Sequence, residues 1–361
     1  MPMPELDPAV GARHVLALPA DGGPDVLEIL ARSRFPRAAW EAADAARPVS
    51  PRGAVSSSGG RHAAGGAAAS STPRALRVSR HSRLIGPFGV GRGTAAELGL
   101  PAGVAYLLDV PVERGARPTP LGGDRLGLRR AFPEGLPVRD EERVLMWALD
   151  VARRLGGAVR VAERDGRPGA LLAPEPAAAV DLTVWSDIWL DPDAAIAVMR
   201  RALPRAYLNL PSGRWYGPPP GTGERVVPGA EVLTGEQRSL LHAAADEFDR
   251  AAMAEPVPMT AFGALADLEL DGMIALEVTG EEAPPPVVGL LPWAARGAVA
   301  YRVRWEPADL ADAEQERPSP AHRVARGRAA PLVVAVARAV HAAVGGEITD
   351  AMDFAVNPAD L

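Results

Sequence analysis

The sequence predicts an α+β protein of two mixed α/β modules behind a disordered N-terminal leader. Short apolar runs typical of strands alternate with amphipathic helical patterns from residue 76 onward. A stretch dominated by Ser, Gly, Ala and Arg precedes them and carries too little apolar surface to offset the entropy of ordering it. The length of 361 residues exceeds one typical domain and suits about two.

Composition shifts divide the chain into five parts. A short helical leader has one helical pattern at 25–33 and a second around Trp40. The expected parts are a leader at 1–46, a flexible Ser/Gly/Ala/Arg linker at 47–75, an α+β module A at 76–210, a Pro/Gly connector with an amphipathic helix at 211–260, and an α+β module B at 261–361.

Module A contains two helices with clear end signals. An apolar stripe predicts a helix over 139–155, and Gly156 and Gly157 are typical of a C-terminal cap. Asp191 and Pro192 have the N-cap and first-turn identities that begin a helix reaching about residue 202. Apolar runs predict strands at 103–111, 158–162, 180–190 and 206–210.

Module B follows a helix that begins at a capping box formed by Thr234 and Gln237. Its apolar runs predict strands at 266–270, 274–279, 299–305 and 347–349, with a helix over 330–344.

Two segments of the chain resemble each other. Ala105 and Tyr106 open a strand, and a helix ending in a glycine pair follows about fifty residues later. Ala300 and Tyr301 do the same, and in both segments a strand follows the glycines. These echoes raise the hypothesis of a divergent internal duplication, although helix–Gly-Gly–strand is also a common local arrangement.

The chain has 39 basic residues, all of them arginine, and no cysteine. The absence of lysine excludes lysine Schiff bases and the lysine of phosphate loops. The absence of cysteine excludes thiolate nucleophiles, disulfides and thiolate metal sites. Because Ala, Gly, Pro and Arg are abundant, we attribute the absence of lysine to the codon bias of a GC-rich genome. No cofactor is expected.

The net charge of −6 is unevenly distributed, with an excess of +4 in residues 1–100 and −10 in residues 101–361. A dedicated nucleic-acid binder needs a basic face, so nucleic acid is an unfavoured partner. The alternative is a weak nucleic-acid contact through the linker, since residues 47–83 hold seven arginines and no acid. The start, MPMPELDPAV, lacks the features of a signal peptide, and no uninterrupted apolar run approaches a membrane span, so we expect a cytoplasmic protein without membrane contact.

One motif is similar to the phosphate loop of AAA-type ATPases, the run PPGTGER at 219–225. Glu224 stands where that loop needs a lysine for the phosphates, and Arg225 stands where it needs a hydroxyl for magnesium. We interpret this run as a proline-rich turn.

Carboxylates at 181, 187, 191 and 193 are the candidates for catalysis. Asp187 with Asp191 or a neighbour would hold magnesium or act as a general acid–base pair. Structural explanations compete, because Asp191 caps a helix and Asp193 complements its dipole. Asp187 alone has no assigned structural role, and Asp350 with Asp353 forms a weaker pair of the same kind.

Arginines at 323, 326 and 328 are the candidates for ligand binding. Guanidinium groups clustered before the last helix would bind a phosphate or a carboxylate, or would pair with the acidic run 309–316. The six histidines lack the spacing of a helical metal site, and no metal is expected.

Three runs, ERVLMWALDVARRLGGAVRV, AVDLTVWSDIWLDPDAA and GAVAYRVRWEPADL, resemble conserved hypothetical proteins of high-GC actinobacteria, a family of unknown function. The resemblance covers roughly residues 85–361 and leaves out the leader. It implies an actinobacterial lineage and a soluble location, and it implies no mechanism and no functional residue.

The function expected from the sequence is non-catalytic binding of another protein or of a small anionic ligand. The competing hypothesis is a metal-assisted hydrolase or transferase that uses Asp187 and neighbouring carboxylates. Neither hypothesis specifies the identity of the ligand or the oligomeric state.

Overall fold

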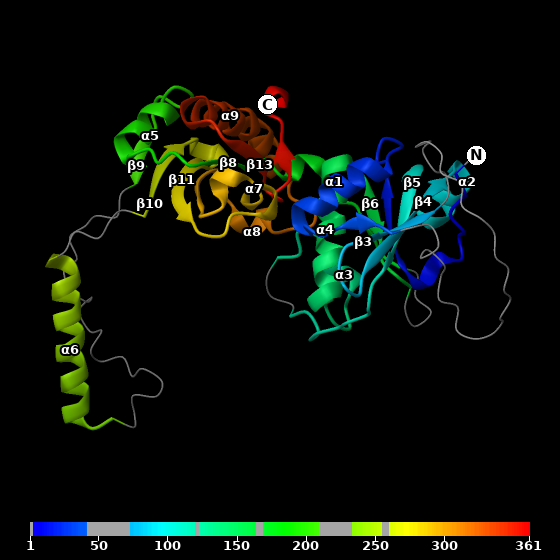
Figure 1. Ribbon diagram of the computed structural model, residues 1–361, viewed down its shortest axis with the longest axis horizontal. Helices are drawn as coiled ribbons and strands as arrows, with labels where there is room; N and C mark the ends of the chain where they lie inside the picture. The colour runs from blue at the N-terminus through cyan, green and yellow to red at the C-terminus, as the bar shows by residue number, and fades with distance from the viewer. Residues whose placement is uncertain (1–2, 42–72, 120–122, 164–168, 210–232, 255–259) are drawn as a thin grey trace.

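The computed structural model describes residues 3–41, 73–119, 123–163, 169–209, 233–254 and 260–361, and Figure 1 shows two lobes built around two β-sheets. The fold of these residues is α+β with two modules, as the sequence predicts. Most of the predicted linker and connector, and with them the run at 219–225, lie outside the described residues.

The first sheet is centred on β1 (His14–Leu18), whose five residues are all buried. This strand pairs with β5 on one side and with β6 on the other, in antiparallel register. The described part of the sheet has seven strands in the order β2 (Ala39–Trp40), β3 (Arg74–Arg77), β4 (Arg83–Val90), β5 (Gly103–Asp109), β1, β6 (Ala158–Arg160) and β7 (Leu171–Leu172).

Helices cover both faces of this sheet. On one face, α1 (Pro24–Arg34) and α4 (Arg139–Leu155) pack on alternate strand residues such as Leu16. On the other face, α2 (Arg92–Leu98) packs on the intervening residues such as Val15. The short α3 (Leu128–Ala131) lies next to β7. The sheet is therefore buried on both sides, which explains why the last four residues of β1, at 15–18, form a continuous apolar run rather than an alternating one.

The second sheet is covered in the same way. The helices α5 (Pro192–Met199) and α9 (Pro320–Val344) pack on one face, and α7 (Pro286–Gly289) packs near Trp185 on the other. A short helix, α8 (Leu310–Ala313), precedes α9. The described strands lie in the order β9 (Tyr207–Asn209), β10 (Ala261–Asp267), β11 (Met273–Glu281), β12 (Ala298–Glu306), β8 (Leu182–Ser186), β13 (Glu347–Asp350) and β14 (Ala355–Val356).

The two sheets share one topology. Adding seven to each strand number of the first sheet gives the strand order of the second, and every described pairing within both sheets is antiparallel. Helices occupy the same positions between the strands, with α1 matching α5, α2 matching α7, and α4 matching α9. An internal duplication requires this correspondence.

The glycine pairs have matching structural roles in the two modules. A Cβ atom on Gly157 would lie 2.3 Å from the carbonyl oxygen of Ala17 in β1. A Cβ atom on Gly346, where φ is +87°, would lie 1.9 Å from the carbonyl oxygen of Trp185 in β8. Ala17 pairs with Ala105, and Trp185 pairs with Ala300, so the repeated Ala-Tyr dipeptides occupy equivalent registers. The second glycine after each helix is required because the chain there passes so close to the central strand.

The module boundaries defined by the two sheets differ from those predicted from the composition. The segment 1–46, expected to be a leader, supplies β1, α1 and β2 to the first module. The segment 180–210, expected in module A, supplies β8, α5 and β9 to the second. The reason is that each module begins with its central strand, whose partners lie at least fifty residues further along the chain. The pattern around Trp40 is strand β2 instead of a helix.

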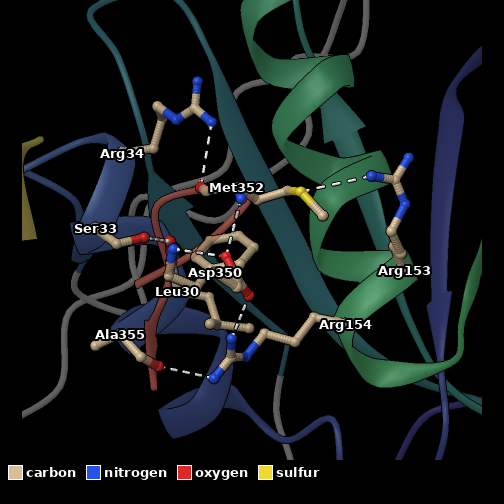
Figure 2. A network of polar contacts seen from close by, with 9 residues as sticks. Leu30, Ser33, Arg34, Arg153, Arg154, Asp350, Met352 and Ala355 are labelled. Atoms are coloured by element: carbon tan, nitrogen blue, oxygen red, sulfur yellow. Dashed lines mark hydrogen bonds and ion pairs between the residues drawn. The ribbon is translucent and has the colours of Figure 1, made fainter. Parts of the chain in front are cut away.

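The loop between β13 and β14 joins the two modules. Met352 and Phe354 belong to the second module but are buried in the core of the first, against α1 and α4. Figure 2 shows the polar contacts around this loop, where Arg34 donates to the Met352 carbonyl at 3.4 Å and Arg154 donates to the Ala355 carbonyl at 2.8 Å. Arg154 also forms an ion pair with Asp350. The modules thus share apolar core as well as charged contacts.

Two helices differ in how they are covered. Figure 1 shows α6 (Gly235–Ala254) apart from both lobes, and the predicted capping box at its start is confirmed by mutual bonds between Thr234 and Gln237 of 2.9 and 3.2 Å. Helix α9 begins ten residues before the predicted 330 and is long and apolar enough for a membrane span by length and composition alone. Its apolar side packs on α5, β8 and β12, and a core helix meets the same criterion.

Candidate functional site

A cleft of about 910 Å³ lies where the two modules meet. The first module contributes residues 125–130 and Arg153 from α4, and the segment 171–181 between the modules forms another wall. The second module contributes residues 305–326 and the tip of the β13–β14 loop. Both modules are needed to form the cleft, because neither contains all of its walls.

Positive charge dominates the lining of this cleft. Its acidic groups are Glu175, Asp181 and Glu316. His322 adds little positive charge, because burial and the nearby Arg326 lower its pKa. Six arginines line the cleft against the three carboxylates, at 125, 130, 153, 317, 323 and 326.

Two of the arginines are paired within the cleft. Arg130 donates to Glu316 through two nitrogens, at 2.6 and 3.0 Å, and so links the modules. The buried Arg326 pairs with Glu175 at 2.6 Å. Arg125 donates to the Ala178 carbonyl at 2.7 Å. These contacts hold the walls in place, and among the described residues they pair two of the six cations with a carboxylate.

Arg153 is the exceptional residue of the cleft. Its side chain is buried, with 7% of the residue exposed, and burial lowers the pKa of the guanidinium from its ordinary value. Among the described residues no carboxylate oxygen lies within 4 Å of it, and its buried Nε has no hydrogen-bond partner. Its Nη1 donates at 3.5 Å to the sulfur of Met352, a weak acceptor (Figure 2). A buried cation in such surroundings costs stability unless another group neutralises it.

The predicted ligand-binding arginines separate in the structure. Arg323 and Arg326 line the cleft, and Arg323 is exposed there without an ion-pair partner among the described residues. Arg328 lies outside the cleft and pairs with Asp271 at 3.4 Å. No sequence signal identifies Arg153, because its neighbours Val151 and Ala152 mark this stretch only as part of a core helix.

The predicted catalytic carboxylates do not converge on one another. Asp187 is exposed after β8, and Asp191 caps α5 by accepting from the Ala194 amide at 2.8 Å, as expected. Asp181 lies in the cleft and accepts from the Trp305 amide at 2.9 Å, and burial raises its pKa. Within the described ranges no group of three or more His, Asp or Glu side chains is arranged to hold a metal ion.

Asp191→Ala tests the capping role directly. Loss of the cap is expected to lower the free energy of unfolding by about 1 kcal/mol. The matched control is Asp193→Ala, which alters an exposed acid in the same turn and should cost only a few tenths of a kcal/mol. Urea unfolding of the two variants measures both costs, and equal costs would contradict the capping role.

A second polar cluster is buried inside the first module. Glu141, fully buried on α4, accepts from the Glu113 amide at 2.8 Å and forms an ion pair with Arg114. The Nε2 atom of His14 lies 3.0 Å from Oε1 of Glu141, and its Nδ1 accepts from the Ala162 amide at 3.0 Å. Burial and Arg114 lower the pKa of His14 to about 4, so this imidazole is neutral at pH 7 and donates through Nε2. The cluster joins β1, α4 and the loop before α3.

Carboxylates of both modules meet beside Arg153. Asp150 on α4 is buried, and this burial raises its pKa to about 6 against the opposing effects of Arg153 and Arg34. Asp350 accepts from the amides of Met352 and Phe354, at 2.9 and 3.0 Å, so its first role is to shape the β13–β14 loop. The predicted pair of Asp350 and Asp353 therefore belongs to the contact between modules.

No family model, curated protein or solved structure matches this chain. The site's own geometry is therefore the basis for a function.

Proposed function

We propose that this protein binds a small anionic ligand in the cleft between its modules and does not itself catalyse a reaction on it. The observation that supports this most strongly is the buried Arg153, which has no carboxylate oxygen within 4 Å among the described residues and an Nε without a hydrogen-bond partner there. Arginine stays protonated even when buried, so its charge calls for a negative partner. A bound anion would supply that partner.

The surroundings of Arg153 favour the same conclusion. Arg125, Arg317 and Arg323 also line the cleft without forming an ion pair among the described residues. Planar guanidinium groups bind phosphate and carboxylate oxygens through paired hydrogen bonds. The predicted enzyme based on Asp187 gains no support, because this carboxylate is exposed and lies outside the cleft. We further propose that the protein acts in the actinobacterial cytoplasm.

Isothermal titration calorimetry with inorganic pyrophosphate tests the binding. Arg323→Ser is expected to weaken binding at least tenfold, because it removes a cation from the cleft wall. Arg328→Ser removes the same charge five residues further along the same helix, outside the cleft, and should change the affinity less than twofold. No binding at millimolar pyrophosphate, or equal losses in the two variants, would contradict the proposal.

Arg153→Met separates a ligand-binding role from a structural one. Methionine keeps most of the volume and removes the buried charge, so the free energy of unfolding should stay within about 1 kcal/mol of the original or increase. Pyrophosphate binding should fall at least tenfold in the same variant. Strong destabilisation with unchanged binding would assign Arg153 to the fold instead.

A further inference from the structure

The charge balance of the cleft limits what it can bind. Six arginines face three carboxylates, and within the described part of the chain only Arg130 and Arg326 of the six form an ion pair. The excess of three positive charges exceeds what one carboxylate or one phosphate monoester would neutralise. A diphosphate ester carries about three negative charges near pH 7, since each phosphate group contributes about −1 to −2.

The size and lining of the cleft indicate an organic ligand rather than an inorganic ion alone. A volume of about 910 Å³ lies in the range of sites for organic ligands, roughly 300 to 1,000 Å³. A bare diphosphate would leave most of this space to water. Apolar side chains occupy several positions of the wall, namely Leu126, Leu171, Trp305, Pro307, Pro318 and Met352.

An aromatic pair holds part of this apolar wall in place. The rings of Trp305 and His322 lie 5.1 Å apart, and the indole Nε1 donates to the Asp271 carbonyl at 2.8 Å. His322 is only partly buried and lines the cleft beside Arg323 and Arg326. An organic group next to the bound phosphates would therefore contact a preformed aromatic surface.

We infer that the ligand is an organic diphosphate, whose phosphates bind Arg153 and the other unpaired arginines while its organic part packs against the wall that contains His322. This inference rests on the proposed function and specifies its ligand class. It distinguishes an organic diphosphate from a monophosphate, a tricarboxylate and inorganic diphosphate.

Calorimetry in EDTA, which removes metal ions, compares these classes on the full chain. The probes are ADP, UDP and isopentenyl diphosphate as three organic diphosphates, with AMP, citrate and inorganic pyrophosphate as the other classes. We expect at least one organic diphosphate to bind tenfold tighter than AMP and citrate and fivefold tighter than pyrophosphate. His322→Ala should remove most of the fivefold advantage and leave the affinity for pyrophosphate within twofold, whereas Arg323→Ser should weaken both ligands alike.

The outcomes separate the two proposals. If pyrophosphate, AMP or citrate binds as tightly as every organic diphosphate, the inference is overturned while anion binding stands. If His322→Ala weakens pyrophosphate and the organic ligand equally, the packing part of the inference is overturned. If none of the six anions binds, the proposed function itself fails.

Discussion

Replacing Glu141 with alanine is expected to lower the free energy of unfolding by about 3–5 kcal/mol. The fully buried carboxylate accepts from His14 and the Glu113 amide and pairs with Arg114, so its removal leaves several polar groups without their acceptor. A buried cation that loses its partner accounts for most of this cost. Chemical denaturation followed by tryptophan fluorescence measures it, since the buried Trp147 lies on the same helix.

The neighbouring Glu142 provides the control for this variant. Its side chain is exposed on the same helix turn, so Glu142→Ala removes an identical side chain without breaking the buried cluster. We expect its effect to stay within about 0.5 kcal/mol. Comparable losses in both variants would show that the cluster around Glu141 does not hold the first module together.

The second large effect is the pH dependence of the folding stability that Asp150 contributes. Its pKa rises from 3.8 to about 6 on folding, so between these values the folded protein binds more protons than the unfolded chain. Stability contributed by this group is therefore present at pH 4 and is lost as the pH rises through 6. The loss corresponds to as much as about 3 kcal/mol, at roughly 1.4 kcal/mol for each unit of pKa.

Asp150→Asn isolates that contribution. Asparagine cannot ionise, so the variant does not lose this stability as the pH rises. Its free energy of unfolding, relative to that of the original protein, should therefore increase by about 2–3 kcal/mol between pH 4 and pH 7.5. His14 acts in the opposite sense, because its lowered pKa makes the fold less stable as the pH falls from 6.5 to 4. Taking the difference between the two proteins at each pH cancels this second effect. A difference that does not change with pH would contradict a raised pKa at Asp150.

The parts of the fold that the sequence predicts correctly are those with local signals. The helix over 139–155 has its predicted bounds, because an apolar stripe and a glycine cap identify it. Asp191 and Pro192 begin α5 for the same kind of reason. The Ala-Tyr and Gly-Gly echoes also correspond to equivalent positions, since backbone contacts with the central strand require them in both modules.

The module boundaries could not be predicted in this way. Strand β1 is separated from its partner β5 by 85 residues, so nothing near His14 indicates that it lies at the centre of a sheet. The predicted start of α9 was ten residues too late, because Pro331 is typical of a helix boundary but lies inside this helix. Pairing between distant segments decided the module boundaries.

The candidate site was predictable only in part. Of the arginines predicted to bind a ligand, 323 and 326 line the cleft, while 328 pairs with Asp271 outside it. Arg153 gives no sequence signal, because its burial depends on Met352, almost two hundred residues away. The cleft exists only after the modules pack, so a single module's sequence does not contain it.

The most direct test of the account is a crystal structure determined with tungstate, a heavy oxyanion that resembles phosphate. Anomalous scattering locates the tungsten atom without reference to any assumption about the ligand. The strongest peak is expected in the cleft between the modules, within hydrogen-bonding reach of the Arg153 guanidinium. Peaks confined to the outer surface, with no tungsten atom within reach of the Arg153 guanidinium, would contradict it.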